Sequence, residues 1–312
     1  MYAMDLLSSK KRIGKTSLIA LRIIFNSNNG LYKLLKEGLS LNKIQNLDHV
    51  GLKHFKFKNI DEVLKKLSNF DLFEEQAINI IDWCDNNNVK IIDIFDEYYP
   101  QNLLEIKSPP CLIFCKGNID LLNNKKSIAI VGTRNSTNYG RKITQNVSSF
   151  FAEKNINIVS GLAMGIDTFA HQASLDVGGY TTAVLVDIKT ISPTSNAKLA
   201  ENIINNNGLI FSENIPGTQP SAGYLFTERN RLQTAISKAL IVIESSVDSG
   251  TSSTCKHALD QGIKIFCSDL RSIKDYPEVL FENSLNKKLV NNEKAIKFTK
   301  KNYDLILNTI SY

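Results

Sequence analysis

The sequence lacks several features that would place it in a special class. Its five cysteines form no CxxC pair and no Cys/His cluster with zinc spacing, so we expect reduced packing residues and no metal. No run of about 18 apolar residues occurs, and the first residues contain no uninterrupted apolar core of a signal peptide. These absences exclude a disulfide scaffold, and they predict a cytoplasmic protein with no membrane partner.

The chain also lacks a large excess of charge of either sign. The chain has 37 Lys+Arg against 31 Asp+Glu, a net charge of +6, which favours an anionic partner without identifying it. Residues 127–270 are balanced, with eleven cations and eleven carboxylates. An anion site in that region must therefore use a few placed cations together with backbone N–H groups.

Four parts are expected along the chain. Residues 1–88 show helical periodicity broken by Asn and Gly, which predicts a small α-helical domain of four or five short helices, helix-hairpin-helix-like or SAM-like. Residues 89–126 predict an extended linker with edge strands between rigid proline turns. Residues 127–270 are expected to form the main domain, and residues 271–312 a short C-terminal segment, too short for a full winged helix.

From Ser127 onward, short apolar runs rich in β-branched residues alternate with segments of helical length. The runs are Ile128–Val131, Ile156–Val159, Thr181–Val186, Leu209–Phe211, Leu240–Ile243 and Lys264–Cys267. This pattern is typical of a parallel sheet covered on both faces and joined by right-handed crossovers. The predicted fold class is α/β: a Rossmann-like, doubly wound, mostly parallel sheet preceded by the small α-helical domain. Ligands of such sheets bind outside the carboxyl ends of the strands.

Four loops expected at that edge are rich in small and hydrogen-bonding residues. Glycine allows close approach of the backbone, and a helix N-terminus presents N–H groups and a partial positive charge to an anion. The candidate phosphate-binding residues are Gly132, Thr133, Arg134, Ser160, Gly161, Gly165, Arg229, Asn230, Arg231, Ser249, Gly250 and Thr251. The sequence therefore predicts an edge that holds the phosphates of a nucleotide or a nucleic acid.

Some of these residues also allow simpler interpretations. A single glycine-containing turn is more often a tight connection than a binding site, and Arg229 beside Glu228 could form an ordinary surface ion pair. Asp167 and His171 are four residues apart and share a helix face. We interpret them as packing and capping residues, and not as partners of Ser160 in a hydrolase, because no nucleophile elbow surrounds Ser160.

Taken together, the loops resemble the DNA-processing protein family DprA, also called Smf. The resemblance rests on several motifs in one order, over about Tyr98 to Asp269: Ile128–Arg134, Val159–Asp167, Ser212–Glu213, Phe226–Arg231 and Ser249–Thr254. It implies a non-catalytic protein without a cofactor that binds single-stranded DNA, protects incoming DNA and loads the RecA recombinase in natural transformation. It also implies a homodimer paired through the Rossmann-like domain.

The resemblance also implies which loops contact DNA. Carried over motif by motif, the contacts are Gly132, Thr133 and Arg134 in the first loop, Ser160 and Gly161 in the second, and Arg229, Asn230 and Arg231 in the fourth. Such binding weakens as salt rises. Two departures lower the expected positive charge: Met164 stands where the family usually has arginine, and Asp187, after the third strand, is expected to bring negative charge close to the site.

Two other functions stay open. The same edge could hold a small signalling nucleotide, as a sensor in a defence or stress system, and the reduced charge at Met164 and Asp187 favours that hypothesis. Alternatively, Glu244 could act on a ribose in a nucleotide N-glycosidic hydrolase. The chain lacks the Pro-Gly-Gly-x-Gly-Thr run of such enzymes and shows no second positioned acid, so we predict no enzymatic activity.

Overall fold

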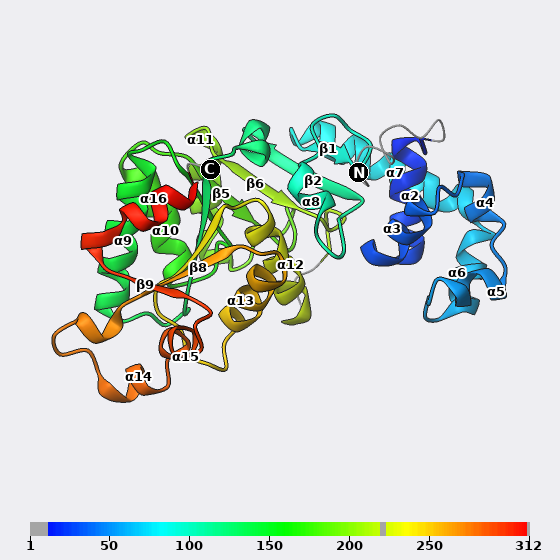
Figure 1. Cartoon of the computed structure of the whole chain (residues 1–312). Coiled ribbons are helices and arrows are strands. Elements are labelled where there is room, and N and C mark those ends of the chain that lie inside the picture. The colour runs from blue at the N-terminus through cyan, green and yellow to red at the C-terminus, as the bar shows by residue number, and fades with distance from the viewer. Residues whose placement is uncertain (1–11, 219–222, 311–312) are drawn as a thin grey trace. The chain divides into compact units, whose positions relative to one another are not determined.

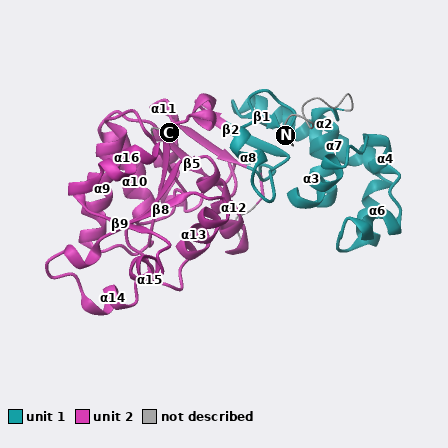
Figure 2. Cartoon of the chain, viewed as in Figure 1, with its two compact units in different colours: residues 1–115, 213–216 teal, residues 116–212, 217–312 magenta. Residues whose placement is uncertain are grey.

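The computed structural model describes residues 12–218 and 223–310 and contains two compact units (Figure 2). The first unit comprises residues 1–115 and 213–216, and the second comprises residues 116–212 and 217–312. None of the helices in the described part of the chain combines the length and the apolar character needed to cross a lipid bilayer. The division into four parts made from the sequence stays a prediction.

Helices dominate the first unit. They are α2 (Lys15–Phe25), α3 (Asn28–Lys36), α4 (Leu41–Gln45), α5 (His49–His54), α6 (Ile60–Leu67), α7 (Phe70–Asn86) and, after the first strand, α8 (Gln101–Leu104). Ser27 and Asp48 start α3 and α5 as N-caps, accepting hydrogen bonds from the N–H groups of Gly30 and Gly51. In the part of the chain that the structure describes, six helices precede the first strand. The sequence predicted four or five, and α4 and α5 are too short for periodicity to separate them.

The first unit also holds a two-stranded antiparallel pair and a buried polar cluster. Strand β1 (Lys90–Asp93) pairs with β2 (Leu112–Gly117). Arg22 Nε donates to Asn28 Oδ1 at 3.1 Å, and Asn28 Nδ2 donates to Glu213 Oε2 at 2.6 Å. Arg22 and Glu213 are both buried. The short segment Glu213–Pro216 therefore belongs by its contacts to the first unit, although the chain on either side of it belongs to the second.

The second unit is built on parallel strands. They are β3 (Ser127–Val131), β4 (Asn157–Ser160), β5 (Thr181–Val184), β6 (Leu209–Ser212), β7 (Ala239–Val242), β8 (Lys264–Ser268) and β9 (Ile296–Phe298). Their order is β6-β5-β4-β3-β7-β8-β9. Successive strands β3 to β6 are added on one side of β3. The chain then crosses back, and β7, β8 and β9 are added on the other side of β3, so the order in which strands are added reverses between β3 and β7. The predicted fold class, a Rossmann-like and mostly parallel sheet, is confirmed.

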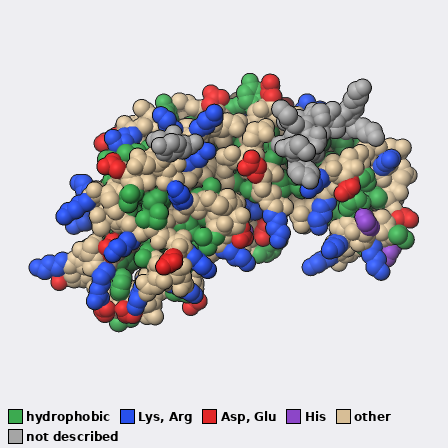
Figure 3. Space-filling model, viewed as in Figure 1, with side chains coloured by type: hydrophobic (Ala, Val, Ile, Leu, Met, Phe, Trp, Pro, Cys, Tyr) green, Lys and Arg blue, Asp and Glu red, His purple; other side chains and the backbone are tan. Residues whose placement is uncertain are grey.

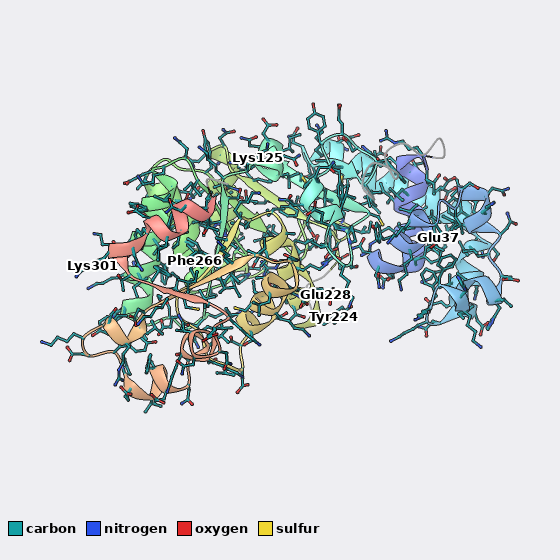
Figure 4. All side chains as sticks on the ribbon, viewed as in Figure 1. Glu37, Lys125, Tyr224, Glu228, Phe266 and Lys301 are labelled. Atoms are coloured by element: carbon teal, nitrogen blue, oxygen red, sulfur yellow. The ribbon has the colours of Figure 1, made fainter. Side chains whose placement is uncertain are left out.

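Helices cover both faces of these strands (Figure 1). One group is α9 (Asn138–Ala152), α10 (Ile166–Asp176), α11 (Ala197–Asn205) and α16 (Asp304–Ile310), and the other is α12 (Gly223–Ala235) and α13 (Gly250–Asp260). Side chains of α9, α10 and α16 form one buried core with β3, β4, β7, β8 and β9, to which Phe266 of β8 contributes (Figure 4). Two further short helices, α14 (Glu278–Glu282) and α15 (Leu285–Asn291), lie between β8 and β9. This packing fixes the loops at the carboxyl edge.

Candidate nucleic-acid interface

A pocket of about 560 Å³ lies at the carboxyl ends of β3 and β7, the switch point where ligands of such sheets bind. Eight of the twelve predicted residues line it: Gly132, Thr133, Arg134, Arg229, Asn230, Ser249, Gly250 and Thr251. The other lining residues are Val131, Ala163, Asp167, Gly223, Phe226, Thr227, Gln233 and Thr254. The structure thus brings the first loop, helix α12 and the start of α13 together, and it leaves Ser160, Gly161, Gly165 and Arg231 outside the lining.

Gly165 lies directly behind the first loop. Its φ is +77°, and a Cβ at this position would lie 2.4 Å from the carbonyl oxygens of both Thr133 and Arg134. The N–H of Ile166 donates to the Thr133 carbonyl at 3.2 Å. Only glycine therefore allows the second loop to approach the first so closely. Gly165 shapes the wall of the pocket from behind.

Arg229 and Asp167 are two charged residues of the pocket wall that are almost fully buried, at 5% and 7% exposure. Arg229 Nη1 donates to the Val184 carbonyl at 2.7 Å, and Asp167 Oδ2 accepts from the N–H groups of Gly161 and Ala163 at 3.1 and 3.4 Å. Burial lowers the pKa of Arg229 to about 10, against the opposing effect of the Asp167 charge, and burial raises the pKa of Asp167. A Cβ on Gly161 would lie 1.9 Å from Arg229 Nη1. Gly161 therefore makes room for the guanidinium.

Ser160 and His171 are fully buried, and neither lines the pocket. Ser160 Oγ donates to the Ile130 carbonyl at 2.7 Å, and His171 Nδ1 lies 2.6 Å from Thr181 Oγ1. Burial lowers the pKa of His171 to about 3, so the ring is neutral at physiological pH. The hydrogen-bond partner of this histidine is thus Thr181 and not Ser160. The geometry does not assemble a nucleophile and its base.

Arg134 is the exposed cation of the pocket. Its guanidinium carbon lies 5.7 Å from the ring centroid of the half-buried Phe226, within the range of a cation–π interaction. The sequence interpretation did not select Phe226 as a binding residue. Its position at the start of the Phe226–Arg231 motif was the available signal, because aromatic rings beside cations stack on nucleic-acid bases.

Helix α13 directs its N-terminus toward the pocket. Thr251 Oγ1 donates to the Gly132 carbonyl at 3.2 Å, and Asn230 Nδ2 donates to the Gly250 carbonyl at 3.3 Å. These bonds fix the helix start against both the first loop and α12. An α-helix of 11 residues carries a partial positive charge at this end, which suits a phosphate group.

The N-terminus of α9 is occupied by a side chain of the protein itself. Glu244 is buried, and its Oε2 accepts from the N–H and the hydroxyl of Thr137 at 3.0 and 3.2 Å. Its Oε1 accepts from the Tyr276 hydroxyl at 2.7 Å. Glu244 is absent from the pocket lining. The carboxylate on which a glycosidic hydrolase would depend is thus engaged in holding the loops together.

Arg231, Asp187 and Met164 lie outside the pocket lining. Arg231 is buried, and its Nη1 donates to the Glu228 carbonyl at 2.8 Å. Asp187 accepts from the N–H groups of Lys189 and Gly217 at 3.0 and 3.1 Å. Met164 is 52% exposed. Neither Asp187 nor Met164 lines the pocket, and the Asp187 carboxylate closes its own loop. That Asp187 brings negative charge close to the site stays a prediction.

Comparisons with known proteins agree on one family. The model of the family described as DNA recombination-mediator protein A matches residues 90–304. The DNA processing protein DprA of Streptococcus pneumoniae is 34% identical over 252 residues, which cover 77% of this chain and 86% of that protein. Protein Smf of Escherichia coli is 32% identical over 240 residues, covering 73% of this chain and 64% of that protein.

Solved structures give the same result. The structure of S. pneumoniae DprA superposes with a TM-score of 0.77 at 27% identity and covers 95% of this chain and 98% of its own. DNA processing protein A of Helicobacter pylori, whose structure concerns its single-stranded DNA binding mode, gives a TM-score of 0.61 at 27% identity, with 70% of this chain and 96% of that chain covered.

Among the described residues, no group of three or more His, Cys, Asp and Glu side chains could hold a metal ion.

Proposed function

Since the chain belongs to the DNA recombination-mediator protein A family, we propose that it binds single-stranded DNA in the pocket at the carboxyl edge of its second unit. One observation carries this proposal: Arg134, Phe226 and the N-terminus of α13 converge on the same cavity. A cation and helix N–H groups suit a phosphate, and an aromatic ring suits a base.

The roles that we propose for the pocket residues follow from how exposed each side chain is. Arg134 is free to reach a phosphate because its side chain is exposed, and a bidentate guanidinium–phosphate contact is strong. Arg229 is held by Val184 at 2.7 Å, so it acts mainly as a fixed positive charge within the wall. Gly250 and Thr251 lie in the first turn of α13, where backbone N–H groups have no partner within the helix. This arrangement binds backbone and base faces without reading sequence.

The wider biology of the proposal rests on the family. We propose that the protein protects incoming DNA and loads the RecA recombinase onto it, as in natural transformation, and that it acts as a homodimer through its second unit without catalysing a reaction. A loading test measures RecA filament formation on DNA already covered by single-strand binding protein. The protein should accelerate it, and Arg134→Ala should not.

The binding proposal is tested by fluorescence anisotropy with a labelled, unstructured oligonucleotide at moderate salt. Arg134→Ala should weaken binding about tenfold, the effect of losing roughly 1.4 kcal/mol of a charge-assisted contact. Lys125→Ala is the matched control, because it removes one exposed cation at the start of β3, at the opposite edge of the strands. Figure 4 shows Lys125 well away from Tyr224 and Glu228 on α12. Equal losses in the two variants would refute a specific role for the pocket.

A mononucleotide titration distinguishes the sensor hypothesis. The pocket volume of about 560 Å³ lies within the range of small-molecule sites. If a mononucleotide or a cyclic nucleotide saturated the wild-type protein while oligonucleotides did not bind, the DNA proposal would fail and nucleotide sensing would replace it. If both bound competitively, the mononucleotide would be acting as a fragment of the DNA ligand.

A further inference from the structure

The first unit carries a cationic surface that the DNA pocket does not use. We call it the α5 basic surface: Lys43 on α4, Lys53 with His49 and His54 on α5, and Lys56 and Lys58 in the turn before α6. All six side chains are exposed. Figure 3 shows blue and purple side chains on this part of the chain, with red side chains among them. The surface belongs wholly to the first unit.

The turn that presents two of these lysines is held rigidly. Phe57 stacks on Phe25 of α2 with ring centroids 4.7 Å apart, and it lies so close to Gly30 that a Cβ there would be 2.4 Å from the ring. The Phe57 N–H donates to the Leu52 carbonyl at 3.1 Å. Lys56 adopts a φ of +60°, a conformation that costs energy in a residue with a side chain. Lys56 and Lys58 therefore flank an anchored aromatic ring and point outward on a fixed turn.

The nearby exposed carboxylates, Asp48, Asp61 and Glu62, are fewer than the four lysines of this surface. Asp48 uses Oδ1 to accept from the Gly51 N–H at 2.7 Å as the N-cap of α5. Glu62 forms an ion pair with Lys66 at 2.6 Å. Lys43, Lys53, Lys56 and Lys58 form no ion pair with any residue that the structure describes. The four lysines therefore exceed Asp48 and Asp61, the carboxylates not engaged with Lys66, and the resulting net positive charge attracts an anion.

We propose that the α5 basic surface is a second DNA contact that holds the sugar–phosphate backbone. Its cations are lysines, which act on phosphates as point charges. The Phe57 ring is already stacked on Phe25, so it is used within the fold. Contacts of this kind are independent of sequence and strandedness. The choice of DNA as the polyanion rests on the proposed function of the pocket. Two contacts on one strand raise overall affinity through effective concentration.

The experiment compares the binding of long and short DNA by the chain of 312 residues. The variant Lys53→Gln/Lys56→Gln/Lys58→Gln should bind an oligonucleotide of about 50 nucleotides roughly tenfold more weakly at low salt, and the slope of log Kd against log salt should fall by about 2, because about 0.7 counterions are released per phosphate contact. Binding of an oligonucleotide of about 8 nucleotides, which fills only the pocket, should not change. The control variant Lys125→Gln/Lys126→Gln/Lys264→Gln removes three exposed lysines at the starts of β3 and β8 and should leave the slope unchanged.

The outcomes separate this inference from the function proposed for the pocket. An unchanged slope in the lysine variant, or an equal loss in the control variant, overturns the inference while short-oligonucleotide binding still supports the pocket. Salt-dependent binding of duplex DNA that survives Arg134→Ala and disappears in the lysine variant supports the inference even if the pocket proposal fails. Binding of phosphatidylglycerol vesicles in place of any DNA would overturn it in favour of an anionic lipid surface. Thermal denaturation of each variant verifies folding.

Discussion

Replacing Arg229 with alanine should destabilise the protein far more than replacing Arg134, although both arginines line the same pocket. Arg229 is 5% exposed and donates to the Val184 carbonyl at 2.7 Å. Its removal leaves that carbonyl without this donor and leaves Asp167, 7% exposed, without its neighbouring positive charge. Uncompensated buried charges cost about 3–5 kcal/mol, a large share of the roughly 5–15 kcal/mol that stabilises a protein of ordinary size.

The double variant Arg229→Ala/Asp167→Asn gives the physical test of that reasoning. Removing the carboxylate charge together with the guanidinium should recover about 1–3 kcal/mol relative to the sum of the single changes. Arg134→Ala, at an exposed position, should change the free energy of unfolding by less than about 0.5 kcal/mol. Urea denaturation followed by circular dichroism measures all four variants.

The pH dependence of the Arg229→Ala deficit adds a second readout. Burial already raises the pKa of Asp167, and the Arg229 charge opposes that rise, so the loss of arginine should raise this pKa further. A folded-state pKa above the unfolded value means that the folded protein binds the proton more tightly, so stability falls as pH rises through that range. The deficit should therefore be smaller near pH 4.5 than at pH 7. A variant as stable as the wild type but unable to bind DNA would refute the anchoring role and make Arg229 a direct ligand contact.

Two further changes test the packing around the site. Tyr276→Phe removes the hydroxyl that donates to Glu244 at 2.7 Å and should lower the free energy of unfolding by about 1–2 kcal/mol, as measured by urea denaturation; no change would mean that this bond contributes nothing. His171 has a folded-state pKa of about 3 against 6.5, so protons bind the unfolded chain more tightly, and its contribution should cost about 1.4 kcal/mol per pH unit as pH falls from 6 to 4. In His171→Gln, the free energy of unfolding should fall less steeply between pH 6 and pH 4 than in the wild type. Parallel pH profiles of the two proteins would contradict a lowered pKa of His171.

The sequence predicted the sheet and its edge because both have strong local signals. Apolar runs such as Ile128–Val131 and Leu240–Ile243, short and rich in β-branched residues between segments of helical length, favour buried strands, and the observed β3 and β7 overlap them. Once the strands were parallel, the loops after them had to meet at one edge. The meeting of the Gly132–Arg134 and Ser249–Thr251 loops around one pocket follows from topology alone.

The orientation of individual side chains could not be predicted in the same way. A pattern places Arg229 and Arg231 on a helix, but burial depends on the partners that tertiary packing supplies, here the carbonyls of Val184 and Glu228. The sequence shows that Asp187 is acidic, but it does not show that its carboxylate accepts hydrogen bonds from N–H groups of its own loop. Strand β9 has three residues, two of them exposed, so it offered no alternating pattern.

The mixed membership of the first unit has a consequence for how this protein can change over evolutionary time. Its helices and the segment Glu213–Pro216 come from two stretches of the gene separated by the codons for residues 116–212. A recombination event that replaced only the amino-terminal stretch would give Glu213 a foreign neighbour in place of Asn28, the residue that now donates to it at 2.6 Å. An amino-terminal stretch taken from a relative would therefore need a hydrogen-bond donor at position 28 to keep this contact with Glu213.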